Sequence, residues 1–140
     1  MMNVLFITLD QFRGDSLSCA GHPIVQTPHL DALASQGVRL GAHYSQAAPC
    51  SPARASLYTG MYQMNHRVVA NGTPLDDRFD NIARIAGRAG YEPVLFGYTD
   101  QAIDPRLVED RNDPRLQSYE GVLAGFDCKL NLIAGHEPGI

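Results

Sequence analysis

The stretch CSPARASLYTG, at residues 50–60, is the most informative part of this 140-residue chain. Proline has a fixed φ and no N–H, so Pro52 suits the first turn of a helix, and Ser51 before it is a good N-cap. The glycine that closes the stretch suits the end of that helix. The sequence therefore predicts a helix over residues 52–59, with Cys50 at its positive end and Arg54 within about one turn of Cys50.

This position gives Cys50 and Arg54 a possible chemistry. The positive end of a helix favours a thiolate or a bound oxyanion, and Arg54 can direct its donors at the same anion. A lone cysteine is more often a small buried apolar residue. A cysteine-phosphatase loop is excluded because it needs five residues between Cys and Arg, whereas three separate this pair. No Cys-x-x-Cys is present, and Cys19 and Cys128 are interpreted as structural or incidental.

The spacing Cys-x-Pro-x-Arg, followed by Thr-Gly, resembles the signature of type I sulfatases. In that family a formylglycine-generating enzyme oxidises the cysteine to an aldehyde, and the hydrate of the aldehyde is the nucleophile. The resemblance implies that Cys50 and Arg54 are catalytic residues of a hydrolase of sulfate, phosphonate or phosphate esters. It also implies the fold: a three-layer, alkaline-phosphatase-like α/β domain with a mostly parallel central sheet.

The rest of the chain alternates between strand-like and helix-like segments, which indicates helices packed on a mostly parallel sheet. No element is predicted from residue 99 onward. The expected elements are a buried strand over 3–9, a helix over 28–36 stopped by Gly37, a weaker strand over 38–44, a helix from a cap at Asp80 or Asn81 to Gly90, and a strand over 91–98 with its core at 94–96.

Asp10 follows the first apolar run directly, and Gln11 follows Asp10. Taken alone, such an Asp is most simply a turn or cap residue. The pattern Ile-Thr-Leu-Asp is, however, similar to the first metal-ligand segment of sulfatases, most of which have two consecutive aspartates there. The resemblance implies a divalent cation (Ca, Mn or Mg) held by Asp10, Gln11 and Cys50. A Gln after that Asp is similar to the related phosphonate monoester hydrolases and phosphodiesterases.

A second departure points to the same branch. Many sulfatases have Gly-Lys-Trp-His where this chain has Gly-Tyr-Thr-Asp at 97–100, so Tyr98 and Thr99 offer hydroxyl donors in place of Lys and His. Asn71 matches an active-site amide of the phosphonate hydrolases, although Asn-Gly is otherwise simply a turn signal. The resemblance implies that Asn71, Tyr98 and Thr99 contact the substrate.

Part of the family's active site has no counterpart in the sequence. Sulfatases complete the metal site with an Asp-Asn or Asp-His pair far downstream, and residues 1–140 contain no such pair at a suitable position. We therefore expect residues 1–140 to be the N-terminal, incomplete part of a catalytic domain. A metal site with half of its ligands binds weakly, so this part alone is expected to be inactive.

The composition excludes some other classes of protein. The net charge of −4 and a pI near 5.6 do not suit binding to nucleic acid. No apolar run approaches the ~20 residues of a membrane helix, and no basic segment precedes the first apolar run. The resulting expectation is a cytoplasmic enzyme that acts on a small molecule, with a monomer and a homo-oligomer both left open.

Three functions remain open at this stage. Hydrolysis of phosphonate monoesters and phosphate diesters comes first, because of Gln11, Tyr98 and Thr99. An arylsulfatase comes second. The alternative of another class is a non-catalytic remnant that keeps the motif but lacks the downstream metal ligands.

Overall fold

The computed structural model describes residues 2–131, which divide into two compact units on either side of the Tyr44–Ser45 bond. The first unit contains the 3-10 helix η1 (Ser18–Ala20) and α1 (Pro28–Gln36). The second contains the remaining elements: α2 (Cys50–Thr59), α3 (Gln63–His66), α4 (Ile82–Arg88), β1 (Val94–Phe96), η2 (Pro105–Leu107), η3 (Pro114–Leu116) and β2 (Asp127–Leu130).

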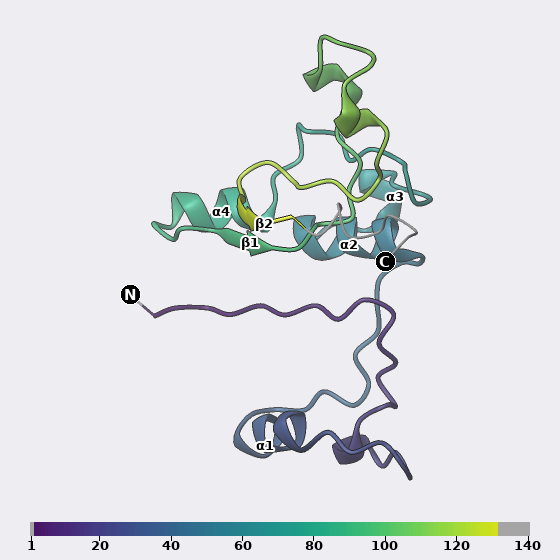
Figure 1. The fold of residues 1–140 in the computed structure, drawn as a ribbon, viewed down its shortest axis with the longest axis vertical. Helices are drawn as coiled ribbons and strands as arrows, with labels where there is room; N and C mark the ends of the chain where they lie inside the picture. The colour runs from purple at the N-terminus through teal and green to yellow at the C-terminus, as the bar shows by residue number, and fades with distance from the viewer. Residues whose placement is uncertain (1, 132–140) are drawn as a thin grey trace. The chain divides into compact units, whose positions relative to one another are not determined.

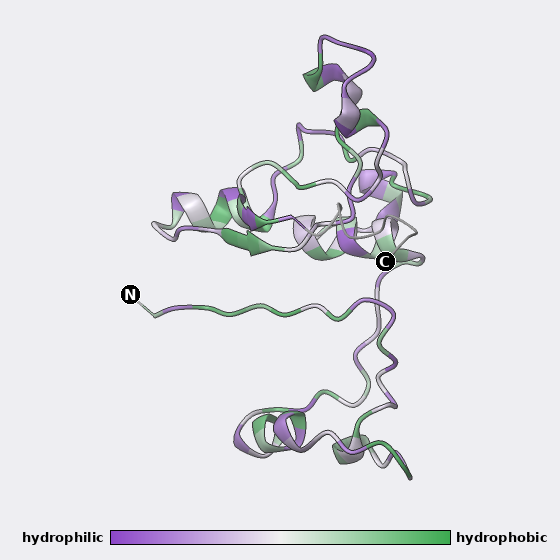
Figure 2. Cartoon of the chain, viewed as in Figure 1, coloured by the Kyte–Doolittle hydropathy of each residue, from purple (hydrophilic) through white to green (hydrophobic). Residues whose placement is uncertain are grey.

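In the first unit, the strands expected over 3–9 and 38–44 do not form. The trace of residues 3–9 is extended but pairs with nothing within the described chain (Figure 1), and its side chains are exposed, Leu5 by 85%. Figure 2 shows the run as a hydrophobic stretch. A strand requires hydrogen bonds from a neighbouring strand, and β1 and β2 pair only with each other among residues 2–131. The apolar pattern was therefore insufficient to make a strand here.

The helix predicted over 28–36 is confirmed as α1, and Asp31 in its first turn ties it to η1. The Asp31 carboxylate accepts hydrogen bonds from Ser18 Oγ, Thr27 Oγ1 and the Cys19 N–H. The bond from Ser18 is the main cause that lowers the pKa of Asp31. Since an ionised carboxylate only accepts, this set of donors fixes the start of α1, although the side chain of the N-cap, Thr27, accepts no capping hydrogen bond from the N–H groups of the helix.

In the second unit, the predicted helix at 52–59 is confirmed but starts earlier than expected. α2 begins at Cys50, so the prediction that Ser51 is its N-cap is wrong. The Ser51 N–H donates to Asn71 Oδ1 at 3.0 Å, so a side chain distant in sequence does what a local cap would do. Gly60 ends the helix with a φ of 69°, in the left-handed region that glycine adopts without strain, as expected.

α4 and β1 follow the sequence prediction closely. Asn81 is the N-cap of α4, and its Oδ1 accepts from the N–H groups of Ala83 and Arg84. The helix ends at Arg88, two residues before the predicted Gly90. β1 forms at the core of the predicted strand and pairs in parallel with β2. The sequence did not reveal β2, because the residues of β2, DCKL, lack an apolar run.

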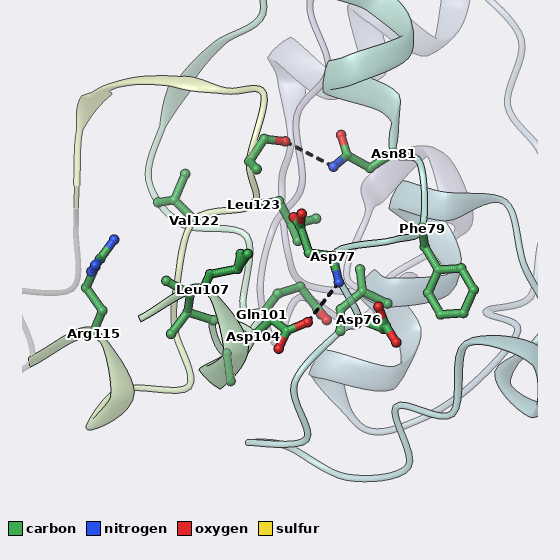
Figure 3. Close-up of a pocket in the computed structure, with 14 residues that line it drawn as sticks. Asp76, Asp77, Phe79, Asn81, Gln101, Asp104, Leu107, Arg115, Val122 and Leu123 are labelled. Atoms are coloured by element: carbon green, nitrogen blue, oxygen red, sulfur yellow. Dashed lines mark hydrogen bonds between the residues drawn. The ribbon is translucent and has the colours of Figure 1, made fainter. Parts of the chain in front are cut away.

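A small core includes one residue of α2 and residues of the loops that follow it. Ala55, Val68 and Leu75 are buried, with Phe79 and Leu123 packed against them. Beside it, a pocket of about 260 Å³ lies between residues 75–81, 101–107 and 122–124 (Figure 3). Asp104 lines this pocket and accepts from the Asp77 N–H and from Arg106, and the latter bond holds the pKa of Asp104 well below its usual range.

The Asn81 cap gives a stability prediction. Asn81 is buried, and besides capping α4 its Nδ2 donates to Ala124 O at 3.0 Å (Figure 3). Asn81→Ala removes the cap and leaves that carbonyl unsatisfied, so we expect the free energy of unfolding to fall by about 2 kcal/mol. Urea unfolding of the full-length protein measures the change. Asn112→Ala, at an exposed position, is the matched control; equal effects of the two substitutions would contradict the role given to Asn81.

Candidate functional site

The candidate site is built on the first two turns of α2. Cys50 is the first residue of the helix, and both Cys50 and Arg54 are half-buried. The guanidinium carbon of Arg54 lies 5.2 Å from the ring centroid of Tyr98, a cation–π arrangement. Tyr98 comes from the segment that follows β1, so the fold brings together a helix start and the end of a strand. Whether the Tyr98 hydroxyl contacts substrate stays a prediction.

Sequence reasoning missed two residues near this site: Tyr58, which interacts with Arg54, and Asp100, whose charge acts on Tyr58. Tyr58, one turn further along α2, is 6% exposed. Burial raises the pKa of Tyr58, and this effect outweighs the charge and the hydrogen bond of Arg54, which both lower it. Asp100 is 2% exposed, and its charge also acts to raise the pKa of Tyr58. The spacing of Arg54 and Tyr58, four residues apart on one helix, was a usable signal. Asp100 has a φ of 57°, which the sequence does not reveal.

Asn71 lies at the start of α2, as its assignment to the active site requires. Its Oδ1 accepts from the Ser51 N–H, and the residue is exposed. The carbonyl of Ser51 accepts a further hydrogen bond from Gln101 Nε2 at 2.8 Å. Asn71 is therefore attached to the residue that follows Cys50, and its contact with substrate stays a prediction.

Thr99 has a different environment from Tyr98. Its side chain is fully buried; Oγ1 donates to Gly121 O at 2.8 Å and accepts from the Leu123 N–H at 2.9 Å. These bonds attach residue 99 to the segment around 121–123. The hydroxyl is thus committed to the backbone in this structure, and its predicted contact with substrate stays untested.

A buried Ser–His pair lies between α2 and α3, but its hydrogen bonds do not suit nucleophilic catalysis. His66 Nε2 lies 2.8 Å from Ser56 Oγ, and His66 Nδ1 accepts from the Val68 N–H at 3.1 Å. Because Nδ1 accepts, the neutral ring carries its proton on Nε2 and donates it to Ser56. The ring nitrogen facing Ser56 therefore has no lone pair with which to take the serine proton, and the pair joins α2 to the end of α3.

His66 gives a prediction of pH dependence. Burial lowers the pKa of His66 below the value of about 6.5 found in unfolded chains. Between the pKa of His66 in the folded state and that in the unfolded state, the unfolded state binds more protons. The contribution of neutral His66 to the free energy of unfolding is therefore fully present above about pH 6.5 and is lost as the pH falls below that value. We expect the urea midpoint to decrease on acidification from pH 7 to 5. His66→Gln should flatten that decrease, whereas His29→Gln, at an exposed position, should leave it unchanged.

Comparisons with known proteins identify the family of the chain. The profile of the sulfatase family matches residues 2–117, which is most of the chain and includes Cys50, Arg54 and Tyr98. The chain belongs to the sulfatase family. Among its curated relatives, PehA of Trinickia caryophylli, described as a multifunctional alkaline phosphatase superfamily protein, is 42% identical over 129 residues. An ulvan-active sulfatase of Formosa agariphila is 39% identical over 95 residues, covering 68% of this chain and 19% of that protein.

Solved structures also resemble this sulfatase-family chain. The phosphonate monoester hydrolase of Agrobacterium radiobacter is 61% identical, with a TM-score of 0.81 over 87% of this chain and 24% of that one. The phosphonate monoester hydrolase of Silicibacter pomeroyi is 48% identical, with a TM-score of 0.89 over 99% of this chain and 27% of that one. The fold is therefore sulfatase-like, and the chain spans about a quarter of the length of these relatives, PehA included at 25%.

The metal ligands expected of a sulfatase come from both units. Asp10 and Gln11 belong to the first unit and Cys50 to the second. Asp10 and Gln11 are exposed, Gln11 with a φ of 53°, and Asp10 Oδ1 accepts the Gln11 N–H at 2.9 Å. Carboxylate and amide oxygens suit a hard divalent cation, which takes about six or more ligands. Within residues 2–131, no three His, Cys, Asp or Glu residues gather as a metal site. The donor types fit such an ion, but their number is incomplete.

None of the helices formed by residues 2–131 has the length and apolar character needed to cross a membrane. The longest of them is α2, with ten residues.

Proposed function

We propose that the full-length protein hydrolyses phosphonate monoesters and phosphate diesters, with a formylglycine made from Cys50 as its nucleophile. The observation that carries this proposal is the arrangement at the start of α2: the Cys-x-Pro-x-Arg segment forms the first turns of a helix, with Arg54 against Tyr98. The identity of 61% to a phosphonate monoester hydrolase supports this substrate class ahead of arylsulfates.

Each part of the arrangement has a role in binding and turnover. The first turn of α2 places partial positive charge beside residue 50, which favours an anionic group there. Arg54 binds the non-bridging oxygens and stabilises the charge that develops on them. The Tyr98 ring covers one face of the guanidinium, which restricts the directions in which Arg54 can donate. Together these residues orient the ester for attack by residue 50.

Two groups complete the proposed chemistry. The aldehyde hydrate of formylglycine supplies one hydroxyl for attack and a second through which the bound group is expelled. The divalent cation supplies positive charge that polarises the ester. Asp10, Gln11 and the residue made from Cys50 hold the cation, together with ligands contributed by the rest of the full-length protein.

The finer architecture belongs to this proposal as well. In a three-layer, alkaline-phosphatase-like domain with a mostly parallel central sheet, residues 3–9 form a strand. Five large apolar side chains in residues 3–9 are more than half exposed here (Val4, Leu5, Phe6, Ile7 and Leu9), and burying them in such a sheet is favourable. In this arrangement Asp10 stands at the carboxyl end of its strand, where α/β enzymes place their sites.

The experiment compares three substrates with one leaving group: an aryl phosphonate, an aryl phosphodiester and an aryl sulfate. The full-length protein is produced with a formylglycine-generating enzyme, and intact mass establishes conversion of Cys50. We expect kcat/KM for the first two substrates to exceed that for the sulfate by about tenfold or more. A preference for the sulfate would make the protein an arylsulfatase. No turnover of any substrate by converted protein would favour a non-catalytic remnant.

A further inference from the structure

Gln101 is the largest fully buried side chain among the described residues, and its hydrogen bonds lead to the nucleophile. The residue is 1% exposed. Its Nε2 donates to Ser51 O and to Asp100 O, both at 2.8 Å. Ser51 lies 50 positions earlier in the chain and immediately follows Cys50. A long polar side chain is thus buried against the turn that carries the proposed nucleophile.

The two bonds to the backbone of Ser51 hold that turn from two directions. Asn71 Oδ1 accepts from the Ser51 N–H at 3.0 Å, and Gln101 Nε2 donates to its carbonyl. The Ser51 N–H belongs to the peptide that joins it to Cys50, and the Ser51 carbonyl belongs to the next peptide. Because both peptides are fixed, so is the direction in which the side chain of residue 50 leaves the helix.

Gln101 is itself held in place by the segment that follows η3. The neighbouring Thr99 bonds Gly121 O through both its N–H, at 3.0 Å, and its Oγ1. A Cβ at Gly121 would lie 2.3 Å from Gln101 O, so only glycine allows this close approach. The backbone from 99 to 101 therefore has little freedom, and a side chain anchored on it can determine the position of its partner.

The amide of Gln101 is not explained by packing alone. Its Oε1 is buried with no hydrogen-bond partner among the described residues, and the side chain lines the pocket shown in Figure 3. A buried acceptor without a partner is costly, so a residue with no polar role would be better replaced by an apolar one of the same size. The feature that an apolar residue cannot supply is the Nε2 donor to Ser51.

We propose that Gln101 is a positioning residue, which holds the Cys50–Ser51 turn of α2 so that residue 50 faces the ester bound by Arg54. This inference rests on the proposed function for its catalytic consequence only. The mechanical part, that the Gln101 amide immobilises the start of α2, holds whatever the protein acts on.

The test uses Gln101→Met in the full-length protein, because methionine matches the length of glutamine but donates no hydrogen bond. Gln117→Met, at an exposed position, is the matched control. We expect amide hydrogen exchange of residues 50–54 to rise about tenfold or more in Gln101→Met, with residues 82–88 of α4 unchanged. We expect kcat to fall about tenfold with KM within about twofold of wild type, because positioning acts on the reacting geometry and not on substrate binding.

A second variant keeps the test informative if Gln101→Met does not melt cooperatively. Gln101→Asn retains an amide one methylene shorter, which loses its reach to Ser51, and the same local rise in exchange is expected. Unchanged exchange at 50–54 in a folded variant would overturn the proposal, and so would a KM increase with kcat unchanged. If the wild-type protein turns over no ester, the proposed function fails while the exchange measurement still decides the role of Gln101.

Discussion

Replacing Cys50 by serine is expected to lower kcat by about three orders of magnitude or more in the full-length protein. The serine hydroxyl keeps its place at the start of α2, beside Arg54, so substrate binding should change little. However, the modifying enzyme recognises a cysteine, so the serine is not converted to formylglycine. Without the aldehyde, the enzyme has no means of expelling the group that becomes bound to residue 50. Steady-state rates on an aryl phosphonate measure the loss, and burst kinetics show whether one turnover occurs.

The control for Cys50→Ser is Cys128→Ser, the same change on β2 in the same unit. Peptide masses of the wild-type protein should show conversion at Cys50 only, with Cys19 and Cys128 as thiols, because the modifying enzyme reads a linear Cys-x-Pro-x-Arg segment. Wild-type turnover by Cys50→Ser would contradict the proposed nucleophile. Full activity of a protein whose Cys50 is demonstrably a thiol would contradict it equally.

Arg54→Lys is expected to lower kcat by about two orders of magnitude, even though the charge is retained. Lysine is a point charge with no planar fork, so it cannot donate two parallel bonds to the non-bridging oxygens or stack on Tyr98 as a guanidinium does. Both features depend on the arrangement in which the Arg54 guanidinium lies 5.2 Å from the Tyr98 ring. Rates are expressed per converted enzyme, with conversion measured by intact mass, so that a failure of modification is not counted as a failure of catalysis.

Arg111→Lys, at an exposed position, is the control for that substitution and should retain wild-type rates. A second comparison separates stacking from charge: Tyr98→Leu should reduce kcat less than Arg54→Lys does, because it leaves the guanidinium in place. If Arg54→Lys retained more than half of the wild-type kcat, the proposed role of Arg54 in binding the developing charge would be wrong.

The elements that the sequence predicted correctly depend on local chemistry. The sequence predicted α1, α4 and the core of β1 correctly. Their signals are a proline, an asparagine cap and a short apolar run, and each of these affects only the backbone within a few residues of it. The family was recognised for a similar reason: the spacing from Cys50 to Gly60 is a property of one continuous segment, and the comparisons confirm it.

What the sequence could not determine depends on partners far along the chain. Residues 3–9 have the pattern of a buried strand, yet a strand forms only where another strand supplies hydrogen bonds, and within residues 2–131 none pairs with them. β2 shows the opposite case, since its residues lack the pattern but pair with β1. A side-chain pattern is local, whereas sheet pairing is not.

The same division applies to the candidate site. The sequence identified Cys50 and Arg54, because catalytic residue types at a fixed spacing are visible in one segment. Only the tertiary structure placed Tyr98 against Arg54 and joined Asn71 and Gln101 to Ser51. These contacts join positions 20 to 50 residues apart, and they exist because the folded backbone of the second unit brings separate loops to the start of α2. A local segment of the sequence thus determines which residues are candidates for catalysis, whereas the fold determines which other side chains surround them.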